Sequence, residues 1–161
     1  MNISFDLDRT LIPNEKEFNT EKRSLIAKYF GIEKLRKGSR NLIKDLQNQG
    51  YTIHIYTTSF RSKFRIRTTL QYYGIKVNLI VNQTENQKVL RSKNINASKY
   101  PPAFNFDIHI DDLIGVGLEG KKHNFKTIII SPNDTNWSET IKKSIKQLSS
   151  TNIIRQKENA Q

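Results

Sequence analysis

The chain has 161 residues, of which 35% are hydrophobic and 26% charged, and its formal net charge is +12. The composition is typical of one soluble globular domain, and the absence of cysteine excludes disulfides, thiolate metal sites and a cysteine nucleophile. No apolar run approaches the roughly 20 residues that span a bilayer, and the first residues lack the pattern of a signal peptide. We therefore expect a monomeric cytoplasmic protein with no membrane segment.

The first half of the chain alternates strand-like and helix-like segments. In chain order these are a strand over 2–7, a helix over 20–30, a helix over 39–49, a strand over 51–57 and a helix over 62–73. Thr20 is expected to cap the first of these helices. Its apolar residues fall on one face, which we expect to point inward: Leu25, Ile26, Tyr29 and Phe30.

The second half continues the alternation after a less regular segment. A strand over 76–81 is followed by polar residues 82–100, where one helical turn near 87–91 is the most that the pattern predicts. A strand over 106–110, a loop or short helix over 113–120, a strand over 125–130 and a helix capped by Asn136 follow. We expect one domain over 1–148 and a polar tail over 149–161.

Strands and helices of these lengths in alternation indicate βαβ units. The expected fold class is therefore α/β, a Rossmann-like three-layer sandwich with a mainly parallel sheet. In such sheets ligands bind beyond the carboxyl ends of the strands, so side chains at those ends are the first candidates for a site.

Two of the predicted strands end in pairs of acids. Asp6 and Asp8 follow the first strand, and Asp111 and Asp112 follow the strand over 106–110. Thr57 closes another strand. We expect these side chains to meet at one sheet edge, where carboxylate oxygens are the ligands that Mg²⁺ prefers. Each motif alone is common, but the three together at this spacing favour phosphate chemistry.

The residue types in this set are those that phosphoryl transfer needs. Asp6 could attack a phosphoryl group to form an aspartyl-phosphate, and Asp8 could protonate the leaving group and then activate water. Asp111 and Asp112 could complete a metal site. A threonine hydroxyl and a lysine ammonium could hold the phosphoryl oxygens as charge develops.

The motifs resemble those of the haloacid dehalogenase (HAD) superfamily of phosphohydrolases. The segment Phe5-Asp6-Leu7-Asp8-Arg9-Thr10-Leu11 is similar to the first motif of the family, Asp-x-Asp-x-Thr, with Arg9 in place of the commoner glycine. Thr57 matches the second motif, and the pair Asp111-Asp112 matches the acidic fourth motif. The resemblance covers nearly all of residues 1–148.

The resemblance implies a role for each matching residue. Asp6 would be the nucleophile and a Mg²⁺ ligand, and Asp8 the general acid and base, with its backbone carbonyl on Mg²⁺. Thr57 would bind the transferring phosphoryl group. Asp111 would bind Mg²⁺ directly, and Asp112 would bind it through water or orient the other groups.

The lysine of the third motif is less clearly marked in the sequence. Lys99 is our prediction, because it lies just before Pro101 and the strand over 106–110, and Lys93 and Lys88 are the alternatives. Substrate-binding candidates are Thr57, Thr58, Arg61 and Lys99. His109 lies in mid-strand, and we expect it to be a packed core residue.

The spacing of the motifs leaves no room for a large cap domain, so the expected site is open. Residues 61–99 hold nine Lys or Arg residues and one acid, Glu85. Such a stretch can be a solvated face, but it also favours an anionic substrate. We predict a Mg²⁺-dependent phosphatase whose substrate is a phosphorylated small molecule or nucleic-acid end. The alternative is a HAD-like regulatory protein that binds nucleic acid or another anion with little catalysis.

Overall fold

The centre of the computed structural model, which describes residues 1–158, is a five-stranded sheet in which every pair of neighbouring strands is parallel. The strand order is β3-β2-β1-β4-β5. The strands are β1 (Asn2–Phe5), β2 (Thr52–Tyr56), β3 (Ile80–Val81), β4 (Ile108–Asp111) and β5 (Lys126–Ile129). The central position of β1, between β2 and β4, brings the segments that follow these three strands to the same edge.

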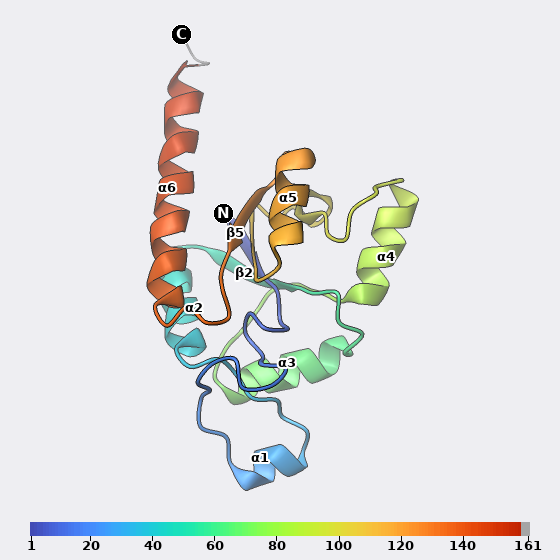
Figure 1. Cartoon of the computed structure of the whole chain (residues 1–161), viewed down its shortest axis with the longest axis vertical. Helices are drawn as coiled ribbons and strands as arrows, with labels where there is room; N and C mark the ends of the chain where they lie inside the picture. Colours follow the sequence, from blue (N-terminus) through green and yellow to red (C-terminus); the bar gives the residue numbers. More distant parts are fainter. Residues whose placement is uncertain (159–161) are drawn as a thin grey trace.

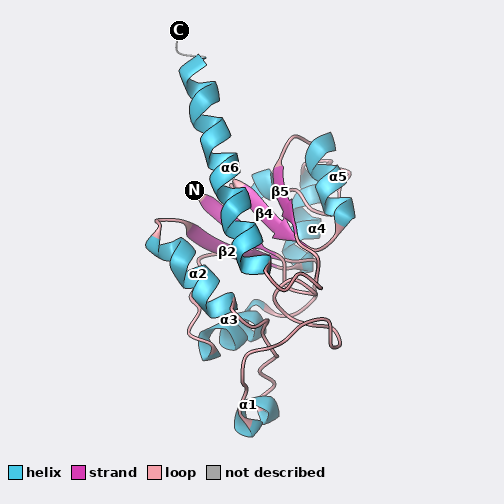
Figure 2. Cartoon of the chain, turned by 60° about the vertical axis from the view of Figure 1, so that its left-hand side comes forward, coloured by secondary structure: helices cyan, strands magenta, loops and turns pink. Residues whose placement is uncertain are grey.

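Helices cover both faces of the sheet (Figures 1 and 2). On one face lie α2 (Ser39–Asn48), α3 (Lys63–Tyr72) and α6 (Trp137–Glu158); on the other lie α4 (Gln83–Ser92) and α5 (Ile114–Lys122). This is the predicted Rossmann-like sandwich, and the predicted lack of a large cap is confirmed for the described residues. None of the helices within 1–158 has the length and apolar character that crossing a membrane requires.

The two faces of the sheet differ in chemistry. Alternate strand residues point to opposite faces, and the face under α2, α3 and α6 is aliphatic, with Ile3, Ile53 and Ile108 in one large core. The opposite face carries aromatic and polar side chains, among them Tyr56 and His109, which are also buried. Polar groups are therefore built into the interior on the side of the sheet that α4 and α5 cover.

The segment between β1 and α2 departs from the prediction. Its helix, α1 (Leu25–Tyr29), is capped by Ser24, not Thr20, because Thr20 forms an antiparallel bridge with Arg36. The predicted inward face is wrong: four side chains are between 71% and 88% exposed, those of Leu25, Ile26, Tyr29 and Phe30. The helix stands away from the sheet (Figure 1), and its one buried residue is Ala27.

Three other segments differ in extent from their predicted forms. The polar region after β3 contains the full helix α4, where one turn was expected. Strand β3 is only Ile80–Val81, although Asn78 and Leu79 before it also form backbone hydrogen bonds with β2. Helix α6 continues past 148 as far as Glu158, so the predicted polar tail begins inside it; residues 159–161 lie outside the described part.

A buried arginine joins the segment after β1 to the segment after β5. Arg36 donates hydrogen bonds to the backbone carbonyls of Ser131, Pro132 and Asp134 at 2.8–3.3 Å. Its guanidinium lies between the rings of Phe18 and Trp137, 4.5 and 4.6 Å from their centroids. Burial lowers its pKa to about 10.

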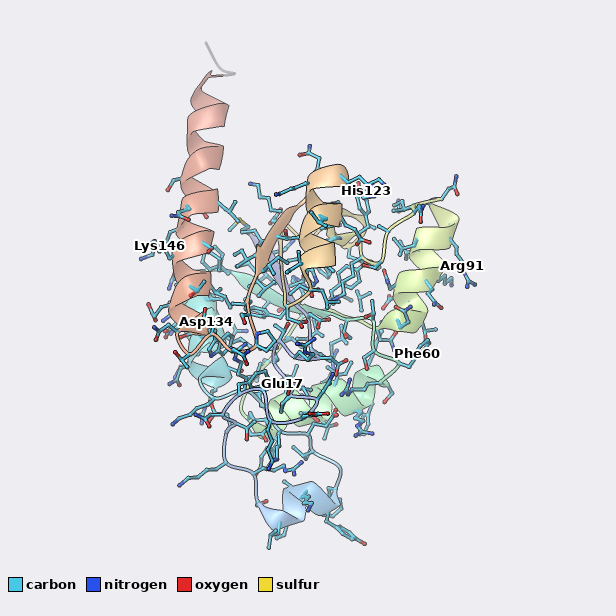
Figure 3. The ribbon with its side chains drawn as sticks, viewed as in Figure 1. Glu17, Phe60, Arg91, His123, Asp134 and Lys146 are labelled. Carbon is cyan, nitrogen blue, oxygen red and sulfur yellow. The ribbon has the colours of Figure 1, made fainter. Side chains whose placement is uncertain are left out.

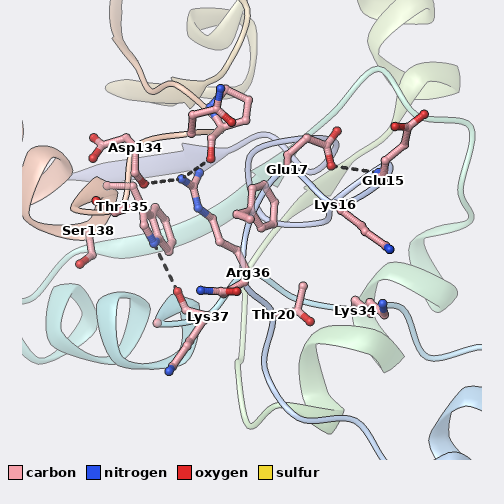
Figure 4. Close-up of a pocket in the computed structure, with 16 residues that line it drawn as sticks. Glu15, Lys16, Glu17, Thr20, Lys34, Arg36, Lys37, Asp134, Thr135 and Ser138 are labelled. Atoms are coloured by element: carbon pink, nitrogen blue, oxygen red, sulfur yellow. Dashed lines mark hydrogen bonds between the residues drawn. The ribbon is translucent and has the colours of Figure 1, made fainter.

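The same arginine lines a cavity of about 710 Å³ (Figure 4), which the predicted acids do not line. Lys16, Lys34 and Lys37 stand around it. The hydrogen bonds of Arg36 to carbonyl oxygens leave this guanidinium committed to the protein itself, so its role here is structural.

We predict that Arg36→Lys lowers the free energy of unfolding by about 2 kcal/mol, because an ammonium lacks the planar surface that fills the space between the two rings and does not reproduce the donor geometry of the guanidinium. Urea unfolding followed by circular dichroism measures this. Arg40→Lys, an exposed change of the same type on α2, should have an effect below about 0.5 kcal/mol. Equal effects of the two substitutions would contradict a stabilising role of the contacts that Arg36 makes between the segments after β1 and β5.

Candidate active site

Three of the predicted acids meet at the carboxyl edge of the sheet. Asp6, Asp111 and Asp112 each place a carboxylate oxygen within 4.8 Å of the other two. The parallel register fixes this, because Phe5 pairs with Ile110 and the next amide, that of Asp6, donates to the Ile110 carbonyl at 2.8 Å. The central strands thus deliver negative charge to one small volume.

Lys99 supplies the matching positive charge. Its Nζ lies 2.6 Å from Asp6 Oδ1 and 2.6 Å from Asp111 Oδ2, and its side chain is only 1% exposed. Such an ammonium, paired twice, offsets the cost of burying two carboxylates. Of the three lysines that the sequence left open for the third motif, the structure brings Lys99 to the acids, whereas Lys88 and Lys93 are exposed.

The loop that carries Lys99 is held by side chains from three different elements. The Glu119 carboxylate on α5 accepts hydrogen bonds from the Ser98 amide and hydroxyl and from the Lys99 amide, at 2.8, 2.7 and 3.3 Å. Asn86 on α4 donates to the Ser98 carbonyl at 2.8 Å. The hydroxyl of Tyr56, at the end of β2, accepts from the next amide in the loop. These contacts fix the position of Lys99, although the segment that carries it is neither helix nor strand.

His109, predicted as a packed core residue, is fully buried and also contacts Asp111. Its Nε2 lies 3.0 Å from Asp111 Oδ2, and its Nδ1 lies 2.9 Å from Ser4 Oγ. Burial lowers the pKa of His109, so the ring is neutral. An ionised carboxylate can only accept, so Nε2 carries the proton and Nδ1 accepts from the Ser4 hydroxyl. His109 therefore orients Asp111.

The two carboxylates that share Lys99 differ in their affinity for protons. Burial raises the pKa of Asp6 to about 7, and the nearby charge of Asp111 adds to this, whereas Lys99 opposes it. Burial also acts to raise the pKa of Asp111, but the hydrogen bond from His109 and the charge of Lys99 outweigh it and hold this pKa below the usual range. When one proton enters the pair, it therefore goes to Asp6.

Asp8 lies apart from the three clustered acids and is paired with an arginine. The Arg61 guanidinium lies 2.8 Å from Asp8 Oδ1 and also donates to both oxygens of Glu33, at 3.0 and 2.9 Å. These side chains are partly exposed, with 33% of Asp8 and 21% of Arg61 accessible. Arg61, which was predicted to bind substrate, is paired in this structure with Asp8, the predicted general acid and base.

Arg9 occupies a backbone position that favours glycine. Its φ is +59°, in the left-handed region, which costs a non-glycine residue about 1 kcal/mol or more. The turn directs the side chain toward Asp112 and Glu17, at 3.6 and 3.7 Å. The Arg9 side chain is thus a cation beside the acidic cluster.

The two predicted threonines lie in different environments. Thr57 is buried, and its hydroxyl accepts from the Ser59 amide at 3.1 Å. Its own amide donates to the Val81 carbonyl, which fixes the loop at the end of β2. Thr58 is exposed, so its hydroxyl is accessible to a ligand but is not held in place.

The sequence analysis missed two residues of the site and the role of a third. Glu33 follows α1 and holds Arg61, and Glu119 holds the Lys99 loop. Neither glutamate follows a predicted strand, which was the signal used to choose candidates. His109 was noticed, and its place two residues before Asp111 on one strand could have shown that both side chains point to the same face.

The residues of the cluster suit a hard divalent cation. Asp6, Asp111 and Asp112 offer oxygen ligands, which Mg²⁺ prefers. The Lys99 ammonium uses one oxygen of Asp6 and one of Asp111; the other oxygen of Asp111 accepts from the Leu113 amide at 2.9 Å and keeps a lone pair for a metal. The backbone carbonyl of Asp8 is the remaining predicted ligand. The donor set is thus compatible with the predicted Mg²⁺.

Comparison with solved structures supports the fold. A chain from the Pnkp1/Rnl/Hen1 complex superimposes with a TM-score of 0.52 at 16% identity, over 81% of this chain and 45% of that chain. The present chain therefore spans less than half of that protein. A structure described as a predicted HAD-like family hydrolase from Porphyromonas gingivalis gives a TM-score of 0.44 at 12% identity, over 91% of this chain and 96% of that chain, which is too distant to carry an argument.

No protein-family model matches the sequence, and no curated protein sequence matches it at a significant level. At these identities, the structural likeness shows a shared fold and leaves the activity to be argued from the site itself.

We predict that Lys99→Met destabilises the protein by about 3 kcal/mol in EDTA, because two buried carboxylates lose their counter-charge. Mg²⁺ should recover part of this loss, since it supplies positive charge to the same oxygens. Thermal unfolding with and without Mg²⁺ measures both effects. Lys93→Met, at an exposed site, is the control, and a loss of stability for Lys99→Met that is the same in both buffers would contradict the shared site.

The raised pKa of Asp6 predicts how metal-free stability depends on pH. Between about pH 4 and pH 7 the folded state keeps a proton on Asp6 that the unfolded chain releases, so stability falls as pH rises through this window. The slope from this group is at most about 1.4 kcal/mol per pH unit. Urea unfolding in EDTA at several pH values measures it. Asp6→Asn should flatten the profile, and equal slopes for the two proteins would show that another group is responsible.

Proposed function

We propose that the protein is a Mg²⁺-dependent phosphatase that hydrolyses phosphate monoesters through an aspartyl-phosphate. The observation that carries the proposal is the buried Lys99 bridge between Asp6 and Asp111. A lysine held between two acids at a sheet edge suits a site that must receive further negative charge from a phosphoryl group. The retained carboxylates on β1 and β4 suit the metal that would complete this charge balance.

In the proposed reaction Asp6 attacks phosphorus and the bond to the leaving oxygen breaks, while Asp8 gives that oxygen a proton. Asp8 then takes a proton from water, the water oxygen attacks phosphorus, and inorganic phosphate leaves with Asp6 restored. Lys99 stays hydrogen-bonded to Asp6 and stabilises charge on the phosphoryl oxygens. Asp6, Asp111 and Asp112 would hold Mg²⁺, which supplies further positive charge for those oxygens when it is bound.

Because Arg61 is paired with Asp8, the substrate would also have to draw Arg61 away from this carboxylate. The Arg61 Nη1 donates to Asp8 Oδ2 at 3.0 Å and lies 2.8 Å from Oδ1, so it occupies the side of the carboxylate that a leaving group would have to approach. A phosphoryl group entering beside Thr57 offers Arg61 a competing dianion, and transfer of Arg61 to it would leave Asp8 open to the leaving group. Glu33 keeps the guanidinium nearby during this exchange.

The site has no large cap among residues 1–158, so it suits phosphate groups on extended molecules as well as small ones. The alternative, an anion-binding protein with little catalysis, draws on the net charge of +12. A surface that only binds anions does not need three carboxylates beside a buried lysine, so the site geometry favours the enzyme.

The first test is hydrolysis of an aryl phosphate. Wild-type protein should turn the substrate over with Mg²⁺ and not with EDTA. Asp6→Asn should lower kcat by roughly a thousandfold or more, which corresponds to about 4 kcal/mol of activation free energy, because no nucleophile remains. Asp45→Asn, the same chemical change at a half-exposed residue of α2 that pairs with Lys142, should retain wild-type turnover.

Two results would contradict the proposed function. Turnover that survives in Asp6→Asn would rule out the aspartyl-phosphate route. Wild-type protein that is inactive toward aryl phosphates, mononucleotides and phosphorylated oligonucleotides alike would favour the anion-binding alternative.

A further inference from the structure

Two exposed phenylalanines stand beside the candidate site. Phe60 is 74% exposed in the loop between β2 and α3, and Phe64 is 79% exposed in the first turn of α3. Figure 3 shows Phe60 at the outer surface, between the starts of α3 and α4. A single exposed apolar side chain needs no explanation, but two rings four residues apart at the edge of a polar site do.

These rings are connected directly to residues of the site. Phe60 is the chain neighbour of Arg61, whose guanidinium reaches Asp8 at 2.8 Å, and it follows Thr57 by three residues. The Ser62 hydroxyl accepts from the Arg65 amide at 3.2 Å and so fixes the start of the helix that presents Phe64. The two rings therefore belong to the loop and first helical turn that also carry Arg61, the residue that contacts Asp8.

Positive charge continues beyond the rings. Three of the nearby basic side chains are paired within the protein, since Arg61 contacts Asp8 and Glu33, Lys63 contacts Glu85, and Arg65 contacts Glu33. The exposed basic residues farther along α3 and α4 continue the charge: Arg67, Lys88 and Arg91.

Two hydrogen bonds connect the start of α4 to the loop that precedes α3. The Gln83 amide donates to the Ser59 carbonyl, and the Asn82 side chain donates to the Arg61 carbonyl, both at 3.0 Å. The basic residues on α3 and on α4 thus extend from the same loop.

We propose that Phe60, Phe64 and Arg67, called here the α3 platform, bind the last nucleotides of a single-stranded nucleic acid whose terminal phosphate lies at Asp6. The placement of that phosphate rests on the proposed phosphatase function. Exposed rings beside cations are the combination that holds single strands, because bases stack on the rings and the cations follow the backbone. The net charge of +12 and the exposed cations beyond the rings favour a polyanion over a protein partner.

The platform also indicates that an unpaired end is preferred over a blunt duplex. Bases within a duplex stack on each other and present no free face to Phe60 or Phe64, whereas unpaired bases do. The absence of a large cap among the described residues leaves room for the strand to continue over α3.

Binding can be measured without chemistry. The full chain with Asp6→Asn, in EDTA, is titrated against a fluorescent single strand of about 12 nucleotides, as DNA and as RNA, with a 5′-phosphate, a 3′-phosphate or hydroxyl ends. Phe60→Ala and Phe64→Ala should each weaken binding about tenfold, and Phe64→Trp should restore it. Phe30→Ala removes an equally exposed ring on α1 and should change nothing.

The ionic contribution has its own control. Arg67→Gln should reduce the slope of log affinity against log salt by about one, and Lys143→Gln, on the exposed side of α6, should leave it unchanged. Affinity that is insensitive to both phenylalanines, or equal for single strand and blunt duplex, would overturn the platform. Equal affinity for phosphate and hydroxyl ends would overturn the placement of the end at Asp6.

The outcomes separate the two proposals. Aryl phosphate turnover by wild-type protein, together with no strand binding, would overturn the platform and keep the phosphatase. Strand binding that depends on Phe60 and Phe64, in a wild-type protein that hydrolyses no phosphate ester, would overturn the phosphatase and keep the platform as a binding surface.

Discussion

The site and much of the chain around it depend on one buried ammonium. Asp6 directly follows β1 and Asp111 ends the adjacent parallel strand β4, so the sheet itself forces two carboxylates together away from water. Lys99 lies between them at 2.6 Å from each, and it comes from a loop with no regular structure. The acids can therefore be buried only while that loop stays in place, and the contacts of Glu119 and Asn86 with Ser98 hold it there.

The chemical difference between the two faces of the sheet also helps to bury the acids. An aliphatic face can pack against α2, α3 and α6 without hydrogen bonds, and it supplies most of the apolar burial. The other face carries Ser4 and His109. In the interior, one hydrogen bond joins Ser4 to His109 and a second joins His109 to Asp111. Because every polar atom in this chain of contacts has a partner, the buried network holds Asp111 in one orientation at low cost.

The sequence was a good guide where burial on both sides of a strand leaves a continuous apolar run. This is why β1, β4 and their acids were predicted, and why Lys99 followed from its place before β4. It was a poor guide to α1, because the pattern of Leu25, Ile26, Tyr29 and Phe30 is the same whether the face meets a core or water. The partners of Arg61 were also unpredictable, since Glu33 reaches it only after the chain has folded back across the sheet edge.

The site combines a rigid half with an adjustable half, and this division matches what each half would do. Lys99, Asp6 and Asp111 are almost fully buried and multiply hydrogen-bonded, which suits groups that must meet developing charge without rearranging. Asp8, Arg61 and Glu33 are partly exposed, and ion pairs near solvent exchange partners at little cost. A proton donor must change its charge in every cycle, so it belongs in the half where a counter-ion can leave. In the proposed reaction, Arg61, next to the exposed ring of Phe60, would connect that exchange to the molecule that carries the phosphate.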